Sequence, residues 1–86
     1  SGLPRLILYQ RAGCHLCDEM LDALAPWSGR LRLRQVDVDT SPELRRSFGE
    51  LVPVLAAPDG VEICRYFLDD ERLERYLAAS GISASG

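Results

Sequence analysis

The hydrophobic pattern changes abruptly near the start of the chain, and this change limits the folds that the sequence can adopt. Residues 3–9, LPRLILY, form a nearly continuous apolar run, which is typical of a short strand buried on both faces. Directly after it, apolar side chains recur at helical spacing. This predicts a helix from about Cys14 to Ala25, which Pro26 and Gly29 end.

The next two segments repeat the order of strand and helix. RLRLRQVDVD, residues 30–39, alternates leucine with arginine, which is the pattern of a half-exposed strand at a sheet edge. In TSPELRRSFG, Thr40 and Glu43 are spaced as a capping box. Pro42 suits a first turn and Gly49 suits a C-cap, so this segment is predicted to be a short helix.

The last third of the chain has the pattern of a hairpin followed by a helix. Residues 58–60, Pro-Asp-Gly, predict a turn between strands at about 54–57 and 61–66. The adjacent acids Asp69-Asp70 suit the N-terminus of a final helix. That helix is expected to end at a glycine, where a frayed tail of residues 81–86 begins.

The order of elements is therefore β-α-β-α-β-β-α, within a single α/β domain over residues 1–86. A strand, a crossover helix and a second strand form a right-handed parallel pair. The hairpin adds two antiparallel strands. The predicted architecture is a four-stranded mixed sheet flanked by helices.

Composition excludes several classes of protein. The net charge of −3 gives no reason to expect nucleic acid or an anionic membrane as a partner. No apolar run approaches the roughly 18 residues that a membrane span needs. All ten basic residues are arginine, which excludes lysine amine chemistry. Three cysteines are too few and too odd in number for a secreted disulfide framework, so a reducing, cytoplasmic setting is expected. The chain is expected to be a monomer.

Cys14 and Cys17 lie where the first strand ends and the first helix begins. A helix N-terminus presents unpaired N–H groups and a positive dipole end, which stabilise a thiolate. We therefore expect Cys14 to be the attacking sulfur, and Cys17, one turn deeper, to resolve the mixed disulfide. His15 either donates a hydrogen bond or positive charge to that thiolate, or is an exposed residue without a role.

The cysteine pair also has other interpretations. A structural zinc site needs four ligands, which usually come from two pairs of cysteines. The chain has only one Cys-x-x-Cys pair, so no metal is expected within one molecule. A metal or iron–sulfur cluster held between two chains is the alternative function. A permanent structural disulfide is disfavoured because so short a loop removes little unfolded-chain entropy. An adaptor without turnover is a third possibility.

With CHLC at this junction and LVPVL opening the third strand, the chain resembles the thioredoxin-like fold and its glutaredoxin-like branch from Arg5 to about Ala79. YQRAGCHLCDEMLDAL and DVDTSPELRRSFGELVPVL are especially similar to small bacterial glutaredoxin-like proteins. The resemblance implies a cis Val52–Pro53 peptide facing the cysteines, with the Val52 backbone offered to an extended substrate. It implies a thiol–disulfide oxidoreductase in redox homeostasis and electron transport, acting on a disulfide-bearing protein or a small thiol.

The resemblance gives conflicting expectations for glutathione. Arg11 stands where glutaredoxins often carry a lysine that meets a glutathione carboxylate, and Asp69 and Asp70 would meet the free amine. Glutaredoxins that use glutathione usually have Gly-Gly just before that acidic turn. This chain has no glycine from Cys64 to Asp70, where Tyr66 and Phe67 add bulk. Weak glutathione binding and no other cofactor are therefore expected.

Overall fold

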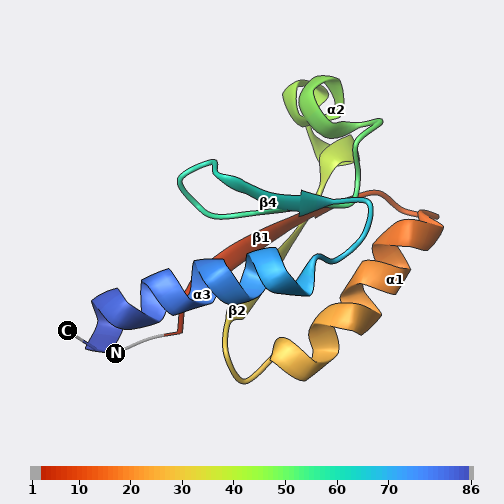
Figure 1. The fold of residues 1–86 in the computed structure, drawn as a ribbon. Coiled ribbons are helices and arrows are strands. Elements are labelled where there is room, and N and C mark those ends of the chain that lie inside the picture. Colours follow the sequence, from red (N-terminus) through yellow and green to blue (C-terminus); the bar gives the residue numbers. More distant parts are fainter. Residues whose placement is uncertain (1–2, 86) are drawn as a thin grey trace.

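The computed structural model describes the backbone of residues 3–85 and the side chains of residues 3–79. Its helices and strands follow the predicted order (Figure 1). The strands are β1 (Arg5–Gln10), β2 (Arg32–Asp37), β3 (Val54–Ala56) and β4 (Glu62–Arg65); the α-helices are α1 (His15–Leu24), α2 (Pro42–Phe48) and α3 (Asp70–Ser85); the short 3-10 helices are η1 (Ala25–Trp27) and η2 (Val38–Thr40).

The four strands form one sheet in the order β2-β1-β3-β4. β1 pairs with β2 in parallel, whereas β3 pairs antiparallel with both β1 and β4. The predicted mixed sheet is therefore confirmed, and β2 lies at an edge as its alternating leucines and arginines indicated. The helix η1 directly follows α1 and contains Pro26, which ends the α-helix at the predicted place.

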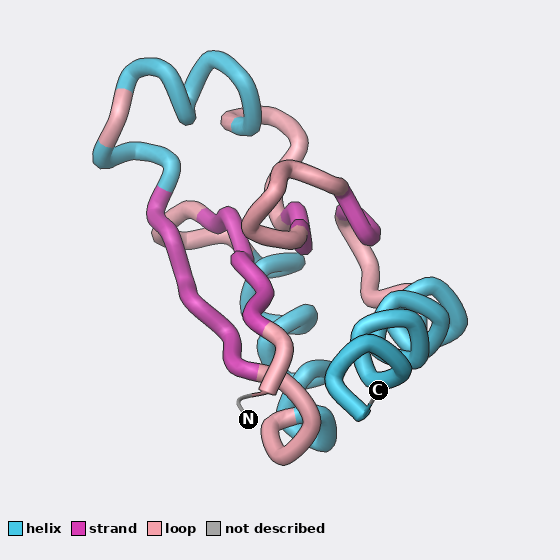
Figure 2. The backbone as a smooth tube through the Cα atoms, turned by 90° about the vertical axis from the view of Figure 1, so that its left-hand side faces the viewer, coloured by secondary structure: helices cyan, strands magenta, loops and turns pink. Residues whose placement is uncertain are grey.

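One face of the sheet carries the main core. Leu6 and Leu8 of β1 are fully buried there, together with Met20 of α1 and Leu73 of α3. The two longer helices therefore cover the same face, while α2 lies apart from them beyond the end of β2 (Figures 1 and 2). Successive side chains of a strand point to opposite faces, so α1 and α3 bury every second residue of β1.

The opposite face is only partly covered. The ring of Tyr9 stacks on Phe48 of α2 with centroids 4.2 Å apart. Because Tyr9 follows Leu8, this contact places α2 against the other face of β1. Ile7 and Tyr9 are half-buried, so the prediction of a strand buried on both faces holds fully for one face only.

The start of α2 differs by one residue from the prediction. The N-cap is Ser41, whose hydroxyl accepts a hydrogen bond from the Leu44 N–H at 3.5 Å. Thr40 belongs to η2, and its hydroxyl donates to the Asp37 carbonyl at 2.6 Å. The capping-box prediction for Thr40 is therefore wrong, because Thr40 is the last residue of the 3-10 helix η2 and its hydroxyl bonds to Asp37 instead of to α2. Gly49 is the C-cap as predicted.

The hairpin forms as its turn residues predicted. Asp59 accepts a hydrogen bond from the Val61 N–H at 3.1 Å, and Gly60 has the positive φ of +98°. The predicted end of the last helix at Gly81 is wrong, since α3 runs to Ser85. A glycine inside a helix costs only about 1 kcal/mol relative to alanine, so it does not have to end one. Fraying of residues 81–86 stays a prediction.

Within the described residues, no helix is long and apolar enough to cross a bilayer. The β-α-β-α-β-β-α order, the mixed sheet and the shared core of α1 and α3 are those of the thioredoxin-like fold that the resemblance implied.

Candidate functional site

The register of the sheet brings three loops to one end of it. Tyr9, near the end of β1, pairs with Val54 at the start of β3, and Val54 pairs with Arg65 at the end of β4. The loop that enters α1, the loop that enters β3 and the loop that leaves β4 therefore meet here (Figure 1). We call this the site end of the sheet. The end of β2 also lies here, because Gln10 pairs with Asp37.

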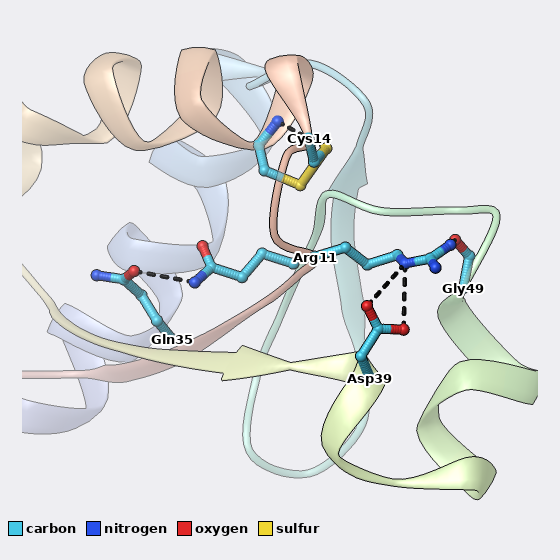
Figure 3. The surroundings of a disulfide bond; sticks show 7 residues. Arg11, Cys14, Gln35, Asp39 and Gly49 are labelled. Carbon is cyan, nitrogen blue, oxygen red and sulfur yellow. Dashed lines mark hydrogen bonds and ion pairs between the residues drawn. A yellow bond between two sulfur atoms is a disulfide. The ribbon is translucent and has the colours of Figure 1, made fainter.

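The cysteine pair lies at the site end. Cys14 is the N-cap of α1, and its Sγ accepts a hydrogen bond from the Cys17 N–H at 3.1 Å. The two residues form a disulfide with their Cα atoms 5.2 Å apart (Figure 3). Gly13, with φ of +74°, supplies the left-handed turn that leads the chain into the helix. The sulfur of Cys14 thus occupies the position where a helix N-terminus favours negative charge.

The two sulfurs differ in access. Cys17 is only 2% exposed and faces the interior, whereas Cys14 is half-buried. An incoming disulfide can therefore reach Cys14 from solvent, while Cys17 is reached from Cys14. This order of access is the one that the predicted roles of attacking and resolving cysteine require.

The Val52–Pro53 peptide is cis, as the resemblance implied, and Pro53 is buried. The Pro53 carbonyl accepts a hydrogen bond from the Tyr66 N–H at 2.8 Å, which ties the loop before β3 to the loop after β4. The Val52 N–H already donates to the Phe48 carbonyl at 3.1 Å. Among the described residues no hydrogen bond reaches the Val52 carbonyl, so that group is the one free to pair with a substrate.

Arg11 makes contacts that the sequence did not predict. Its Nε lies 3.3 Å from the Asp39 carboxylate, and its Nη1 donates to the Gly49 carbonyl at 3.2 Å. The side chain therefore runs toward Asp39 and Gly49 rather than toward the disulfide (Figure 3). The carboxylate already offsets the positive charge of Arg11, which limits what the guanidinium offers to another carboxylate.

Asp39 is a site residue that the sequence analysis missed. Its buried Oδ1 has no well-directed hydrogen bond, and the guanidinium nitrogens of Arg11 and Arg45 lie 3.3 Å from it. The available signal was the acidic run at the end of β2. In a parallel pair the carboxyl ends of neighbouring strands lie together, so this run adjoins the loop that carries Arg11.

The remaining predicted residues lie at two helix starts. His15 is exposed at the first position of α1. Asp69 caps α3, because its carboxylate accepts the Arg72 N–H at 3.1 Å, and Asp70 is the exposed first residue of that helix. Asp69 therefore has a structural role of its own. Binding of a free amine by these acids stays a prediction.

The third cysteine, Cys64, lies away from solvent in the core cluster on β4. Burial raises the pKa of its thiol above the ordinary value, which keeps it protonated and unreactive. Nowhere in the described part of the chain do three His, Cys, Asp or Glu side chains gather closely enough to hold a metal ion.

Known proteins are similar to this chain in sequence and in fold. The model of the family described as Glutaredoxin-like domain (DUF836) matches residues 5–78. The protein Rv0508 of Mycobacterium tuberculosis is 34% identical over 84 residues, covering 90% of this chain and 86% of the relative.

Two solved structures are similar over most of their length. The solution structure of Ne2328 from Nitrosomonas europaea superposes with a TM-score of 0.77 at 34% identity, covering 88% of this chain and 93% of the other. The X-ray structure of XcR50 from X. campestris gives 0.69 at 39% identity, covering 86% and 96%. The chain therefore belongs to the glutaredoxin-like domain family (DUF836).

Proposed function

We propose that this protein is a thiol–disulfide oxidoreductase in which Cys14 is the nucleophile and Cys17 is the resolving thiol. The observation that carries the proposal is the hydrogen bond from the Cys17 N–H to the Cys14 sulfur, at 3.1 Å, at the N-cap of α1. An N–H group and a helix dipole directed at one sulfur stabilise its thiolate, which is the form that attacks disulfides.

The reaction begins with the reduced protein. The Cys14 thiolate attacks one sulfur of a substrate disulfide, and the other substrate sulfur leaves as a thiolate that takes up a proton. Cys17 then loses its proton and attacks the Cys14 sulfur, which releases the second substrate thiol. Two electrons pass from the cysteine pair to the substrate, and the pair becomes the Cys14–Cys17 disulfide. A dithiol donor reduces it again.

The substrate lies along the loop before β3 in this proposal. The free Val52 carbonyl accepts a hydrogen bond from a backbone N–H of an extended segment beside Pro53. The Val52 N–H is available only after its bond to Phe48 opens, so pairing through the carbonyl is the principal contact.

Glutathione is proposed to bind weakly. The Arg11 guanidinium is already paired with Asp39, and Tyr66 occupies the turn where glycine would let a ligand backbone approach. The exposed acids of α3 offer only weak, screened attraction to an amine. The natural partner is therefore proposed to be a disulfide-bearing protein, with a dithiol rather than glutathione as the electron donor.

The proposed setting is redox homeostasis in a reducing compartment, by a monomer. The net charge of −3 argues against nucleic acid and anionic lipid as partners. A monomer suffices because both sulfurs and the loops around them come from one chain.

Trapping of mixed disulfides tests the proposal. A Cys17→Ser variant retains the attacking sulfur without the resolving one, so it accumulates covalent complexes with disulfide-bearing proteins that dithiothreitol releases. Cys14→Ser accumulates few, and Cys64→Ser matches the wild type. Equal trapping by the Cys14 and Cys17 variants contradicts the assigned roles. A brown protein with visible absorbance would instead favour the metal or iron–sulfur module.

A further inference from the structure

The turn that leaves β4 has an unusual composition for its shape. Tyr66 adopts a positive φ of 68°, a left-handed backbone that glycine enters freely and an aromatic residue rarely adopts. The next residue, Phe67, is 67% exposed. We call Tyr66 and Phe67 the aromatic turn. The backbone does not favour a tyrosine at position 66, which is 37% exposed, and burial does not account for a phenylalanine at position 67.

The aromatic turn adjoins the redox site. The Tyr66 N–H donates to the Pro53 carbonyl at 2.8 Å, and Tyr66 directly follows the strand residue Arg65 at the site end of the sheet. The other large exposed apolar side chains among the described residues, Leu3 and Val61, precede β1 and β4. They therefore lie toward the opposite end of the sheet, whereas the two aromatic residues place exposed apolar surface at the site end, where Tyr66 bonds to Pro53.

An acidic depression continues from the aromatic turn. It is open, has a volume of about 610 Å³, and has Phe67 and Leu68 in its lining. Its acids, Glu62, Asp69, Asp70 and Glu71, outnumber its two arginines, Arg65 and Arg72, and Arg65 is already paired with Glu62. Asp70 is exposed at the first position of α3. The surface that continues from Phe67 thus offers an apolar contact followed by an excess of negative charge at the start of α3.

We propose that the aromatic turn selects the substrate, by receiving an apolar side chain that flanks the cysteine of a polypeptide disulfide while a basic residue of the same segment lies over the start of α3. This inference rests on the proposed redox function and names its substrate class. A segment that pairs with the Val52 carbonyl runs beside Pro53, and its neighbouring side chains then meet Tyr66 and Phe67. Aromatic side chains bury much area with little loss of rotamer freedom, which suits such a contact.

Charge distinguishes this occupant from a second copy of the chain. A symmetric dimer centred on Phe67 would bring the acidic starts of two α3 helices together, in a chain with a net charge of −3. A polypeptide with a basic residue complements the same surface. Glutathione has no apolar side chain beside its cysteine, so the aromatic turn offers it nothing.

The test measures single-turnover reduction by the pre-reduced full chain. Two lysine-containing peptides with one cysteine carry either leucine or serine on both sides of it, and each is joined to thionitrobenzoate as a mixed disulfide. The same disulfide of free cysteine is the third substrate. Attack by Cys14 on the peptide sulfur releases thionitrobenzoate, the better leaving group, which is followed by its absorbance. Rate constants are compared for the wild type, Tyr66→Asn/Phe67→Ser and the matched control Val61→Ser.

The wild type and Val61→Ser are expected to prefer the leucine peptide by about fivefold or more, as one aromatic contact supplies. In Tyr66→Asn/Phe67→Ser the preference falls to about one, while the free-cysteine substrate reacts as before. Asparagine tolerates the left-handed backbone, so the double variant keeps its turn. Equal rates for the two peptides in the wild type, or an unchanged preference in the double variant, overturn the inference.

Two further outcomes are decisive. If the wild type reacts with none of the three substrates, the redox function itself is wrong and this inference falls with it. If sedimentation shows a wild-type dimer that Phe67→Ser dissociates, the occupant is a second copy of the chain, which also overturns the proposal.

Discussion

Cys14 and Cys17 are separated by only two residues, yet they have different surroundings. The Cys14 sulfur accepts the Cys17 N–H at the N-cap of α1 and remains accessible, whereas Cys17 is enclosed. Two exposed acids in the first turns of α1, Asp18 and Glu19, act in the opposite sense, because negative charge disfavours a nearby thiolate. The backbone N–H lies 3.1 Å from the sulfur while both acids are exposed to solvent, so we expect the N–H and the helix dipole to prevail.

The first prediction is a lowered pKa for the reduced Cys14. In a Cys17→Ser/Cys64→Ser background, the alkylation rate plotted against pH should have a midpoint below the free-cysteine value of about 8.5. His15→Gln in the same background separates the contributions, since any remaining shift comes from the helix N-terminus. A midpoint at or above the free value would refute activation of this thiol.

A second prediction concerns Tyr66. Glycine removes the cost of the positive φ, but it also increases the freedom of the unfolded chain. The two effects oppose each other, so Tyr66→Gly should change the free energy of unfolding by less than about 1 kcal/mol. Urea unfolding of both proteins measures this. A loss of several kcal/mol would mean that the tyrosine ring holds the fold together and is not reserved for a partner.

At the scale of elements, the loop after β1 and the helix α2 are connected through charge. Arg11 bridges Asp39 of η2 and the C-cap residue of α2, Gly49. Arg45 of α2 approaches the same carboxylate at 3.3 Å. The carboxylate therefore holds two arginines in place at the site end, and it competes with any carboxylate ligand for Arg11.

The third prediction follows from this competition. Asp39→Asn should raise the affinity for glutathione about two- to fivefold, as removal of one partly exposed ion pair allows. Calorimetric titration in a Cys14→Ser/Cys17→Ser background excludes covalent reaction. The control is Asp59→Asn, which removes the same charge at the hairpin and retains the oxygen that accepts the Val61 N–H. An unchanged affinity in Asp39→Asn would show that the ion pair is not what weakens glutathione binding.

A fourth prediction concerns the contact between α3 and the segment after α1. Arg30 lies over the Trp27 ring at 4.8 Å and donates two hydrogen bonds to Glu74, at 2.6 and 3.2 Å. Hydrogen bonding to Arg30 lowers the pKa of Glu74 below its ordinary value. The Glu74 carboxylate therefore stabilises the fold at pH values above the pKa of about 4.3 that glutamate has in the unfolded chain. This contribution is lost as the pH falls through the pKa of Glu74 in the folded protein.

Glu74→Gln should accordingly unfold at a slightly lower urea concentration than the wild type at pH 7, and at the same concentration near pH 2. The effect is small because both partners are exposed. Glu71→Gln is the matched control, since the Glu71–Arg75 pair is wider, at 3.9 Å, and more exposed. A difference between Glu74→Gln and the wild type that persists at low pH would assign the effect to packing rather than charge.

Elements with a strong periodic pattern were predictable from the sequence, whereas residues with two competing partners were not. The helical spacing of apolar residues predicts α1, and the alternation of leucine and arginine predicts the edge strand β2. Thr40 and Ser41 both have a capping side chain, and only the position of η2 selects the serine. The Arg11–Asp39 pair joins residues 28 positions apart, which no local pattern reveals.

At the scale of the whole molecule, the redox state and the stability of the fold should be only loosely coupled. Cys14 and Cys17 are three positions apart, so their disulfide closes a very short loop. A cross-link of that size removes little conformational entropy from the unfolded chain, about 2 kcal/mol in the simplest treatment. Stabilisation of the Cys14 thiolate at the helix N-terminus offsets part of this in the reduced protein.

The fifth prediction is that the oxidised and reduced proteins differ in unfolding free energy by less than about 2 kcal/mol. Parallel urea titrations with and without a dithiol reductant measure the difference. Cys14→Ser/Cys17→Ser gives the free energy of unfolding of a chain that has neither the disulfide nor the two thiols. A much larger difference would make the disulfide a structural bond rather than one that is repeatedly made and broken.

The pairing of Tyr9 with Val54 and of Val54 with Arg65 also has a consequence for biosynthesis. The cysteines precede the loop before β3 and the turn beyond β4 in the sequence, so they are synthesised first. A nascent chain therefore carries its two thiols before it can hold a substrate against them. Translation must pass residue 67 before these loops can assemble, so selective exchange begins only after the turn beyond β4 has been made.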